Sequence, residues 1–441
     1  MAGRPAKTQY LNVWMNGELV GRWGHSSRTG HDFRYDIAWL GNPLRRPLSL
    51  SLPLSSETRP ITGERVENYF NNLLPDSLAI RKRLAAKFGA KASSAFELLS
   101  KVGRDCVGAV QLLPPESPVP EVRRIDATPL TSKQIEKILD ATVAGKNIGG
   151  PEADELRISI AGMQEKTALL WHQGKWCRPR EFTPTTHILK LPLGEVGGMR
   201  ADFSTSVENE WLCAQIASAY GLPVAECRME TFGSYKTLVV TRFDRRMLDT
   251  WWARLPQEDF CQVNGVSSEQ KYEANGGPGI DDILGTLRGS QNAADDRINF
   301  LSAQLLFWVL AAPDGHAKNF SIFLESQDRF RLTPLYDIMS AWPVIGSGAR
   351  QLQWKKVKMA MSISADNTHY RIAEIQRRHW NAVAKRNAMG LDFEQHIERF
   401  ISATPQAIDA VAAQLPKGFP DAVSDPIFEG IKAQVRKLAR G

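Results

Sequence analysis

The stretch AAPDGHAKNFSIF, residues 311–323, gathers polar side chains directly after a long apolar run. That run, INFLSAQLLFWVLAA at 298–312, is apolar on nearly every side, which predicts a buried helix. Pro313 cannot continue the helix comfortably. We therefore expect the polar residues to lie on a loop carried by a rigid element, where binding and catalytic groups concentrate. These polar residues are Asp314, His316, Lys318 and Asn319.

Composition sets broad limits on the class of protein. A chain of 441 residues has room for roughly two to four domains. The five cysteines are scattered and form no C-x-x-C pair, so neither a disulfide framework nor a zinc site is indicated. With no apolar signal region and no membrane-length apolar run, we expect a cytoplasmic protein without membrane contact. A net charge of +7 is compatible with DNA binding but does not by itself imply it.

Local patterns divide the first part of the chain. YLNVWM and ELVGRW, joined by Asn16-Gly17, predict a β-hairpin, because Asn-Gly suits a type I′ turn. The alternating leucines of 48–54 predict a half-buried strand, and residues 67–88 predict a helix interrupted near Pro75. The stretch PPESPVPEVRRIDATPL, residues 114–130, is rich in proline and charge and predicts a linker.

The rest of the chain reads as a sheet followed by helices. Residues 156–191 predict antiparallel strands, including TTHILKLP at 185–192, which carries Lys190. A helix is expected from Ser206, capped by that serine, and a further strand over 236–246. From about residue 256 the pattern is mostly helical. The expected order is an N-terminal subdomain (1–113), a linker (114–130), a sheet-rich lobe (131–255) and a helical lobe (256–441).

Four residues match the requirements of phosphoryl transfer. Asp314 and Asn319 have the spacing D-x-x-x-x-N, Asp337 follows in RLTPLYDIMSAW, and Lys190 precedes them on a predicted strand. A lysine can grip nucleotide phosphates, carboxylate and carboxamide oxygens can hold Mg²⁺, and a second carboxylate can orient the attacking hydroxyl. The order Lys, Asp, Asn, Asp is that of protein kinases.

Each of these features also has a plain structural interpretation. Asp314 could be a turn acid after a helix, and Lys190 a strand lysine with a solvated ammonium group. Taken alone, neither feature distinguishes the functional from the structural interpretation. The G-x-G-x-x-G loop of protein kinases is absent, since the matching segment SIAGMQEK has only Gly162. The chain also has A-P-D and Y-D-I in place of H-R-D and D-F-G. The combined order and element types favour the kinase interpretation.

Several longer strings are specific to one family. RISIAGMQEKTALL, TPTTHILKLP, RLPQEDFCQ, DGHAKNFSIF and RLTPLYDIMSAWPV resemble HipA, a family of bacterial serine/threonine kinases that act as toxins of toxin–antitoxin pairs. The resemblance covers nearly the whole chain, including RPLSLSLPL and NNLLPDS. It implies an α+β, protein-kinase-like two-lobe fold with an extra N-terminal α/β subdomain and a large helical C-terminal lobe. It also implies ATP and Mg²⁺ as cofactors.

The resemblance assigns roles to individual residues. Asp314 matches the catalytic base, Asn319 and Asp337 the Mg²⁺ ligands, and Lys190 the ATP-phosphate lysine. Thr241 stands where the family has a hinge glutamate, but adenine contacts at a hinge usually come from the backbone. The implied nucleotide-binding residues are Ala161, Gly162, Met163, Gln164, Glu165 and Lys166 in the phosphate-binding loop, Thr241, Arg242 and Phe243 at the hinge, and Gln257, His316, Lys318 and Tyr336 nearby.

Two further assignments each have an alternative. The resemblance implies that Ser159 is an autophosphorylation site that silences the kinase, because a phosphate there would repel those of ATP. The alternative is a buried strand serine whose hydroxyl bonds to the backbone. Glu208 and Glu210 both start the helix after Lys190, and either could pair with that lysine. Favourable interaction with the helix dipole would explain both acids without catalysis.

Partners follow from the same resemblance. It implies a HipB-like helix-turn-helix antitoxin bound to operator DNA, and a protein substrate in translation such as an aminoacyl-tRNA synthetase. The basic cluster of 371–386 is then the best candidate for phosphate contacts, although such a cluster taken alone is more often a solvated helix face. A catalytically weak co-repressor scaffold is the rival hypothesis, and a lipid kinase ranks last. The candidate DNA contacts are Arg377, Arg378, Lys385 and Arg386.

Overall fold

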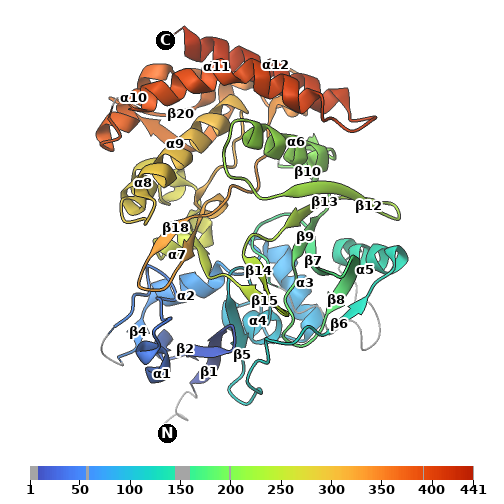
Figure 1. The fold of residues 1–441 in the computed structure, drawn as a ribbon, viewed down its shortest axis with the longest axis vertical. Helices are drawn as coiled ribbons and strands as arrows, with labels where there is room; N and C mark the ends of the chain where they lie inside the picture. The colour runs from blue at the N-terminus through green and yellow to red at the C-terminus, as the bar shows by residue number, and fades with distance from the viewer. Residues whose placement is uncertain (1–7, 56–58, 145–158, 198–199, 391, 441) are drawn as a thin grey trace.

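A computed structural model describes residues 8–55, 59–144, 159–197, 200–390 and 392–440. The chain forms an N-terminal subdomain, a sheet-rich lobe and a helical lobe (Figure 1). Helices α10, α11 and α12 lie at the end of the molecule opposite the N-terminal subdomain (Figure 1). Within these described ranges, no helix is both long and apolar enough to cross a bilayer.

The N-terminal subdomain is a five-stranded antiparallel sheet packed against helices. Its strand order is β4-β3-β2-β1-β5. The predicted hairpin is confirmed, since Asn16 and Gly17, at φ +50° and +86°, link the first two strands. Trp23 stacks on Phe70 in the core with ring centroids 4.0 Å apart. The elements are β1 (Gln9–Met15), β2 (Glu18–Ser26), β3 (Gly30–Tyr35), β4 (Ile61–Thr62), β5 (Val110–Leu113), α1 (Ile37–Gly41), α2 (Glu64–Asn71), α3 (Leu78–Phe88) and α4 (Ala95–Val102).

The break predicted near Pro75 is confirmed, because it falls between α2 and α3. The strand predicted over 48–54 is wrong. Leu48 and Leu52 are fully buried, but the backbone N–H of Leu52 donates to the carbonyl of Ser49 at 3.0 Å. The chain therefore turns back on itself, and a turn produced the alternating pattern that suggested a strand.

The sheet-rich lobe contains a six-stranded sheet in the order β12-β13-β9-β7-β8-β6. The expected strand around Lys190 is present as β9, paired with β13. The strand predicted over 236–246 is present only as far as Thr241, where β13 ends, and Arg245 begins another strand, β14. Ser159 and Ile160, which precede a turn predicted from Ala161-Gly162, form no strand, so this part of the strand prediction is wrong; residues 156–158 lie outside the described ranges. The elements are β6 (Ala127–Pro129), β7 (Lys166–His172), β8 (Lys175–Pro179), β9 (His187–Lys190), β10 (Gly194–Val196), β11 (Ala201–Phe203), β12 (Cys227–Phe232), β13 (Tyr235–Thr241), α5 (Ser132–Ala144) and α6 (Ser206–Ala219).

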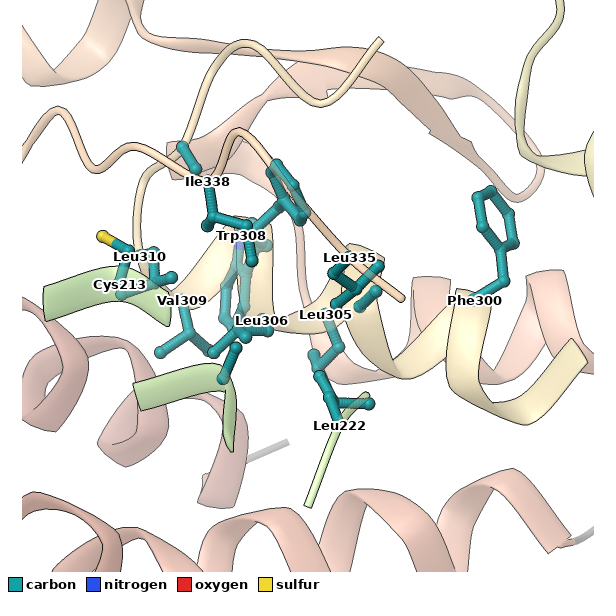
Figure 2. Packing of buried hydrophobic residues seen from close by; sticks show 14 of the residues in the cluster. Cys213, Leu222, Phe300, Leu305, Leu306, Trp308, Val309, Leu310, Leu335 and Ile338 are labelled. Carbon is teal, nitrogen blue, oxygen red and sulfur yellow. The ribbon is translucent and has the colours of Figure 1, made fainter. Parts of the chain in front are cut away.

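The helical lobe is built around one buried helix, α9, as the sequence predicts. Phe300, Leu305 and Trp308 on α9 are at most 1 % exposed and belong to a core that also contains Leu335 and Ile338 (Figure 2). The remaining elements are β14 (Arg245–Leu248), β15 (Trp251–Arg254), β16 (Gln257–Asp259), β17 (Ser321–Leu324), β18 (Phe330–Leu332), β19 (Lys358–Ser364), β20 (Thr368–Arg371), α7 (Phe260–Val263), α8 (Ile280–Leu287), α9 (Ala293–Val309), α10 (Arg377–Arg386), α11 (Asp392–Ala412) and α12 (Asp421–Ala439).

A buried network of charges joins the N-terminal subdomain to the sheet-rich lobe. The carboxylate of Asp105 accepts from the guanidinium groups of Arg245 at 3.0 Å and Arg254 at 3.2 Å, and it lies 3.4 Å from Arg242. Asp244 pairs with Arg242 at 2.8 Å. Burial opposes ionisation of Asp105, but the three guanidinium groups outweigh it and hold its pKa well below the usual range. Removing Asp105 would leave three buried guanidinium groups with only the Asp244 carboxylate, so the junction depends on this residue of the N-terminal subdomain.

Candidate active site

Lys190 is the centre of a buried ion cluster. Its ammonium group, on β9, forms ion pairs with Glu210 on α6 and with Asp337, and its side chain is 5 % exposed. Glu208 instead accepts from Lys236 at 2.6 Å. Of the two candidate helix acids, Glu210 is therefore the one that contacts Lys190. Ser206 does not cap α6 as predicted: Thr205 is the N-cap, and the Ser206 hydroxyl accepts from the backbone N–H of Leu193 at 2.9 Å.

The pKa values in this cluster follow from burial and neighbouring charge. Burial raises the pKa of Glu210, and the charge of Asp337 adds to that rise against the opposing effect of Lys190. Burial also opposes ionisation of Asp337, but Lys190 and Lys166 outweigh it and hold the pKa of Asp337 at about 2. Asp337 is therefore a carboxylate at neutral pH, the form that binds a divalent cation.

The loop after α9 holds the predicted catalytic base. The side chain of Asp314 is 57 % exposed. The Asn319 amide donates through Nδ2 to the carbonyl of Asp314 at 2.6 Å, and the Tyr272 hydroxyl donates to the Asp314 carboxylate. The imidazole Nε2 of His316 lies 3.7 Å from that carboxylate, and burial lowers the pKa of His316 to about 4. His316 is thus neutral, and Asp314 presents an accessible charged oxygen.

The loop that carries Asp337 lies against the catalytic loop. The Tyr336 hydroxyl donates to the carbonyl of Lys318 at 2.9 Å. Asp337 adopts a left-handed backbone at φ +57°, a conformation that non-glycine residues rarely adopt and that occurs often at functional sites. The Phe243 ring lies 5.7 Å from that of Tyr336, so the predicted hinge reaches the same place. The structure thus brings together the predicted hinge, the loop of the predicted base and the metal-ligand candidate.

Gln257 also lies at this junction. Its backbone pairs with Phe323 in the β16–β17 ladder, and the Phe323 ring lies 5.7 Å from that of Phe243. Within the described residues the buried Oε1 of Gln257 has no hydrogen-bond partner. A buried polar atom without a partner is costly, and because this oxygen is enclosed by protein, a ligand donor reaches it only after neighbouring groups move.

Hinge backbone groups are partly occupied by the protein itself. The N–H of Thr241 donates to the carbonyl of Glu226 at 2.8 Å, and the N–H of Arg242 donates to that of Thr186 at 2.9 Å. The Arg242 side chain lies in the buried network around Asp105. Any adenine contact by Thr241 or Arg242 must therefore come from groups other than these two amides and the guanidinium.

The predicted phosphate-binding loop folds onto Lys190. Lys166 is opposite Lys190 in the β7–β9 ladder, and its ammonium group donates to the carbonyl of Ala161 at 2.8 Å. Gly162 has φ +107°, a backbone conformation that favours glycine, and this angle is the reason for a glycine in the loop. The Gln164 amide fixes the other side of the loop by donating to the carbonyl of Leu191 at 2.6 Å. The side chain of Met163, at the tip, is exposed.

The same loop is attached to the N-terminal subdomain. Glu165 forms an ion pair with Arg83 on α3, and the backbone N–H of Asp76 donates to the carbonyl of Gly162 at 3.1 Å. Ser159 is fully buried, and its hydroxyl donates to the carbonyl of Leu73 at 2.6 Å. In this conformation the Ser159 hydroxyl cannot reach a nucleotide.

In the basic cluster of residues 371–386, some of the arginines are paired with acids of the same chain. Arg377 pairs with Glu394 and Glu398 on α11, and Arg386 pairs with Asp281 at 2.8 Å. Both arginines are already neutralised by acids of the same chain. Arg378 and Lys385 are exposed on α10 and are the members of this cluster that are best placed to meet an outside anion.

The donor set fits Mg²⁺ held jointly by protein and phosphate oxygens. Because Asn319 uses its amide nitrogen on the Asp314 carbonyl, its Oδ1 stays free to accept. Asp337 supplies a carboxylate. The described residues contain no group of three or more His, Cys, Asp or Glu side chains that would hold a metal alone. Two protein oxygens plus substrate phosphates is the usual arrangement for Mg²⁺ in kinases.

The fold is a HipA-like kinase fold. Its site combines a strand lysine that pairs with a helix glutamate, a loop with Asp314 and Asn319, and a second acid, Asp337. The described architecture overlays, at a TM-score of 0.78 and 22 % identity, on a solved complex of HipA, HipB and operator DNA from Shewanella oneidensis, covering 98 % of this chain and 97 % of that one. That overlay establishes the fold. The family is established by the sequence comparisons that follow.

The chain belongs to the HipA family. The model of the HipA-like C-terminal domain matches residues 158–412, and that of the HipA N-terminal domain matches residues 11–113. The Y4mE protein of Sinorhizobium fredii is 34 % identical and covers 98 % of both chains. The serine/threonine-protein kinase toxin HipA of Shewanella oneidensis is 28 % identical, with 76 % of each chain covered. The predicted family and fold are confirmed.

Three residues around the site were not found from the sequence. Asp76, Lys271 and Tyr272 approach the catalytic loop from outside it. Asp76 follows Pro75, which reads as an ordinary turn, and Lys271 and Tyr272 lie in a segment without regular periodicity. Only the arrangement in space shows what these residues contact.

Proposed function

We propose that the chain is an ATP- and Mg²⁺-dependent serine/threonine protein kinase that acts as the toxin of a toxin–antitoxin pair. The observation that carries this proposal is the buried pairing of Lys190 with Glu210 and Asp337, next to the loop of Asp314 and Asn319. Protein kinases use this set of groups to position a nucleotide and a hydroxyl. Membership of the HipA family supports the toxin role.

Each group has a distinct task in this proposal. Lys190, oriented by Glu210, binds the nucleotide phosphates, while Asn319 and Asp337 hold the metal. When bound, Mg²⁺·ATP supplies the transferable phosphoryl group and screens the charge that develops on it. Asp314 accepts a hydrogen bond from the substrate hydroxyl and takes its proton. Its exposure allows a serine or threonine of another protein to reach it.

Phe243, Tyr336 and Gln257 form the adenine end of the site in the same proposal. The rings of Phe243 and Tyr336 supply an apolar surface, and Gln257 Oε1 supplies a buried acceptor. An adenine amino group is a donor that this oxygen can bind once the groups that enclose it move aside. Ala161 to Lys166 cover the phosphates, and His316 and Lys318 line the catalytic loop below them.

Ser159 is the proposed autophosphorylation site. Because its hydroxyl is fully buried on the carbonyl of Leu73, the loop must leave this position before transfer. A phosphate adds nearly two negative charges and cannot return to this site without losing its hydration. Modification would thus keep the loop out and remove the cover of the nucleotide phosphates.

The proposed partners are a HipB-like antitoxin, operator DNA in the complex with it, and a protein substrate in translation, all in the cytoplasm. The antitoxin and operator DNA are named in the solved complex that shares this fold. DNA contacts by Arg378 and Lys385 would position the complex without reading sequence. A catalytically weak co-repressor scaffold is the alternative, and it predicts DNA binding without phosphate transfer.

A mixing experiment tests the proposal. Asp314→Asn protein, which keeps Ser159 but lacks the base, is incubated with Ser159→Ala protein, ATP and Mg²⁺. Mass spectrometry should find phosphate on Ser159 of the Asp314→Asn copy, and none when the Ser159→Ala protein is omitted. If Ser159 of that copy stays unmodified while the wild-type chain labels itself, transfer between molecules is excluded. If neither labels, the scaffold alternative holds.

A further inference from the structure

The segment before α8 reaches the catalytic base through Tyr272. The Tyr272 hydroxyl donates to a carboxylate oxygen of Asp314, and its ring stands nearly perpendicular to that of His316 with centroids 5.0 Å apart. Burial and the neighbouring Asp314 charge raise the pKa of Tyr272 far above its usual value. Tyr272 therefore remains a donor at neutral pH. It occupies one carboxylate oxygen and leaves the other for a substrate hydroxyl.

The residue beside Tyr272 is tied to the N-terminal subdomain. Lys271 donates to the Asp76 carboxylate at 3.0 Å, and the carbonyl of Lys271 accepts from the backbone N–H of Ala317 at 3.1 Å. The second oxygen of Asp76 accepts from Lys318 at 2.6 Å. These three side chains are at most 9 % exposed. One carboxylate from the N-terminal subdomain thus holds two lysines that flank the catalytic loop.

Asp76 also contacts the phosphate-binding loop, through its backbone bond to Gly162. It lies between α2 and α3, two elements of the N-terminal subdomain. Buried charges that pair in this way are costly to separate, since a lysine left alone would be desolvated without compensation. The contacts of Asp76 therefore fix the position of Lys271, Lys318 and the loop at once.

We propose that the N-terminal subdomain completes the kinase site: Asp76 fixes the Lys271–Tyr272 segment, and Tyr272 in turn orients the carboxylate of Asp314. Both are positioning residues, and neither transfers a proton to or from substrate. This inference rests on the proposed kinase function and extends it to a part of the chain outside the two lobes. A misplacement of about 1 Å at a reacting group can cost about 100-fold in rate.

A double-mutant cycle tests the coupling between the two positions. Asp76→Asn and Tyr272→Phe should each lower kcat about tenfold or more. Tyr272→Phe should change the KM for ATP less than about threefold, because it keeps the ring and removes only the hydroxyl that is bonded to Asp314. The double variant should be no slower than the slower single variant, because both changes free the carboxylate of Asp314 from its orientation by Tyr272. If the two changes caused independent structural defects, the factors by which they lower kcat would instead multiply.

Asn68→Ala is the matched control, because Asn68 donates to the carbonyl of Gly265 at 2.8 Å across the same junction without touching either lysine. Its effect on kcat should be small, and it should multiply with that of Tyr272→Phe. A Tyr272→Phe variant with wild-type kcat would overturn the proposal, as would a multiplicative effect of Asp76→Asn and Tyr272→Phe. Tyr272→Phe removes one hydroxyl and keeps the ring, so this arm does not depend on whether Asp76→Asn folds.

Hydrogen exchange tests, without any phosphate transfer, whether Asp76 fixes the Lys271–Tyr272 segment against the loop of Asp314. In Asp76→Asn, the backbone amide of Ala317 should exchange about tenfold faster than in the wild type, whereas Asn68→Ala should leave it unchanged. Unchanged exchange at Ala317 in a folded Asp76→Asn protein would overturn the proposal. A wild-type chain that transfers no phosphate would instead remove the proposed kinase function, and the exchange result would still stand.

Discussion

Two charged regions of this molecule differ in how their charges are paired and how deeply they are buried. Around Lys190, opposite charges from β9, α6 and the Asp337 loop meet in a buried place, at 5 % exposure for the lysine. On α10, Arg377 and Arg386 pair with acids of neighbouring helices at or near the surface. The first arrangement brings together segments far apart in sequence at a cost in desolvation, which is how functional sites are built. The second resembles an ordinary solvated surface.

The comparison predicts a large difference in stability. Lys190→Met should lower the free energy of unfolding by about 3–5 kcal/mol, because Glu210 and Asp337 lose their buried partner. Arg386→Met, the same change at a partly exposed ion pair, should cost about 0–1 kcal/mol. Denaturant unfolding of both variants measures the difference. Equal costs would mean that the two ion clusters do not differ as described.

Acid stability should depend on Asp76. Burial opposes its ionisation, but Lys318 and Lys271 outweigh it and hold the pKa of Asp76 at about 2. Because the folded-state pKa is below the unfolded value of about 3.9, the stability that this group contributes is present above pH ~4 and lost as the pH falls toward 2. Its size is on the order of 2 kcal/mol, from about 1.4 kcal/mol per pKa unit.

Asp76→Asn should therefore be less stable than the wild type at neutral pH, and the difference should shrink as the pH falls from 4 to 2. Urea unfolding at a series of pH values measures it. Asp249→Asn, an exposed turn acid, is the control and should follow the wild type throughout. A constant difference between Asp76→Asn and the wild type would contradict the pairing of Asp76 with the two lysines.

The smallest expected effect concerns DNA. In the proposed complex with an antitoxin and operator DNA, Arg378→Glu with Lys385→Glu should reduce the slope of log affinity against log salt by about two, roughly one for each DNA phosphate that is no longer neutralised. Kinase activity should not change. Lys133→Glu with Lys137→Glu on α5, also exposed, is the matched charge control. An unchanged slope would mean that Arg378 and Lys385 do not contact DNA and that α10 is an ordinary solvated helix.

Local chemistry made part of the fold predictable. The Asn16-Gly17 turn, the break at Pro75, the β9 strand with Lys190 and the apolar helix α9 each follow from short-range patterns. The strand over 48–54 was wrong because a turn between Ser49 and Leu52 can bury alternate leucines as a strand does. Short apolar alternation alone does not separate these two cases.

Parts of the site could not be predicted, because they depend on contacts between distant segments. Glu208 and Glu210 are both buried on a helix that is buried on most sides, so periodicity could not say which one faces Lys190. Asp76 lies 195 residues before its partner Lys271 in the sequence, and no motif links it to the segment of Lys271 and Tyr272. For the same reason, the acids that neutralise Arg377 and Arg386 are not visible from the basic cluster alone.

Transfer of phosphate from labelled ATP is the most direct test of the central claim, that the Lys190 cluster and the Asp314 loop form a kinase site. Wild-type protein with Mg²⁺ should phosphorylate itself, and chelation of the metal should stop the reaction. Asp314→Asn should lower the rate about 10²–10⁴-fold, the usual contribution of a general base, with an unchanged unfolding curve. Transfer by Asp314→Asn at the wild-type rate, or no transfer by the wild type at saturating Mg²⁺·ATP, would contradict the account.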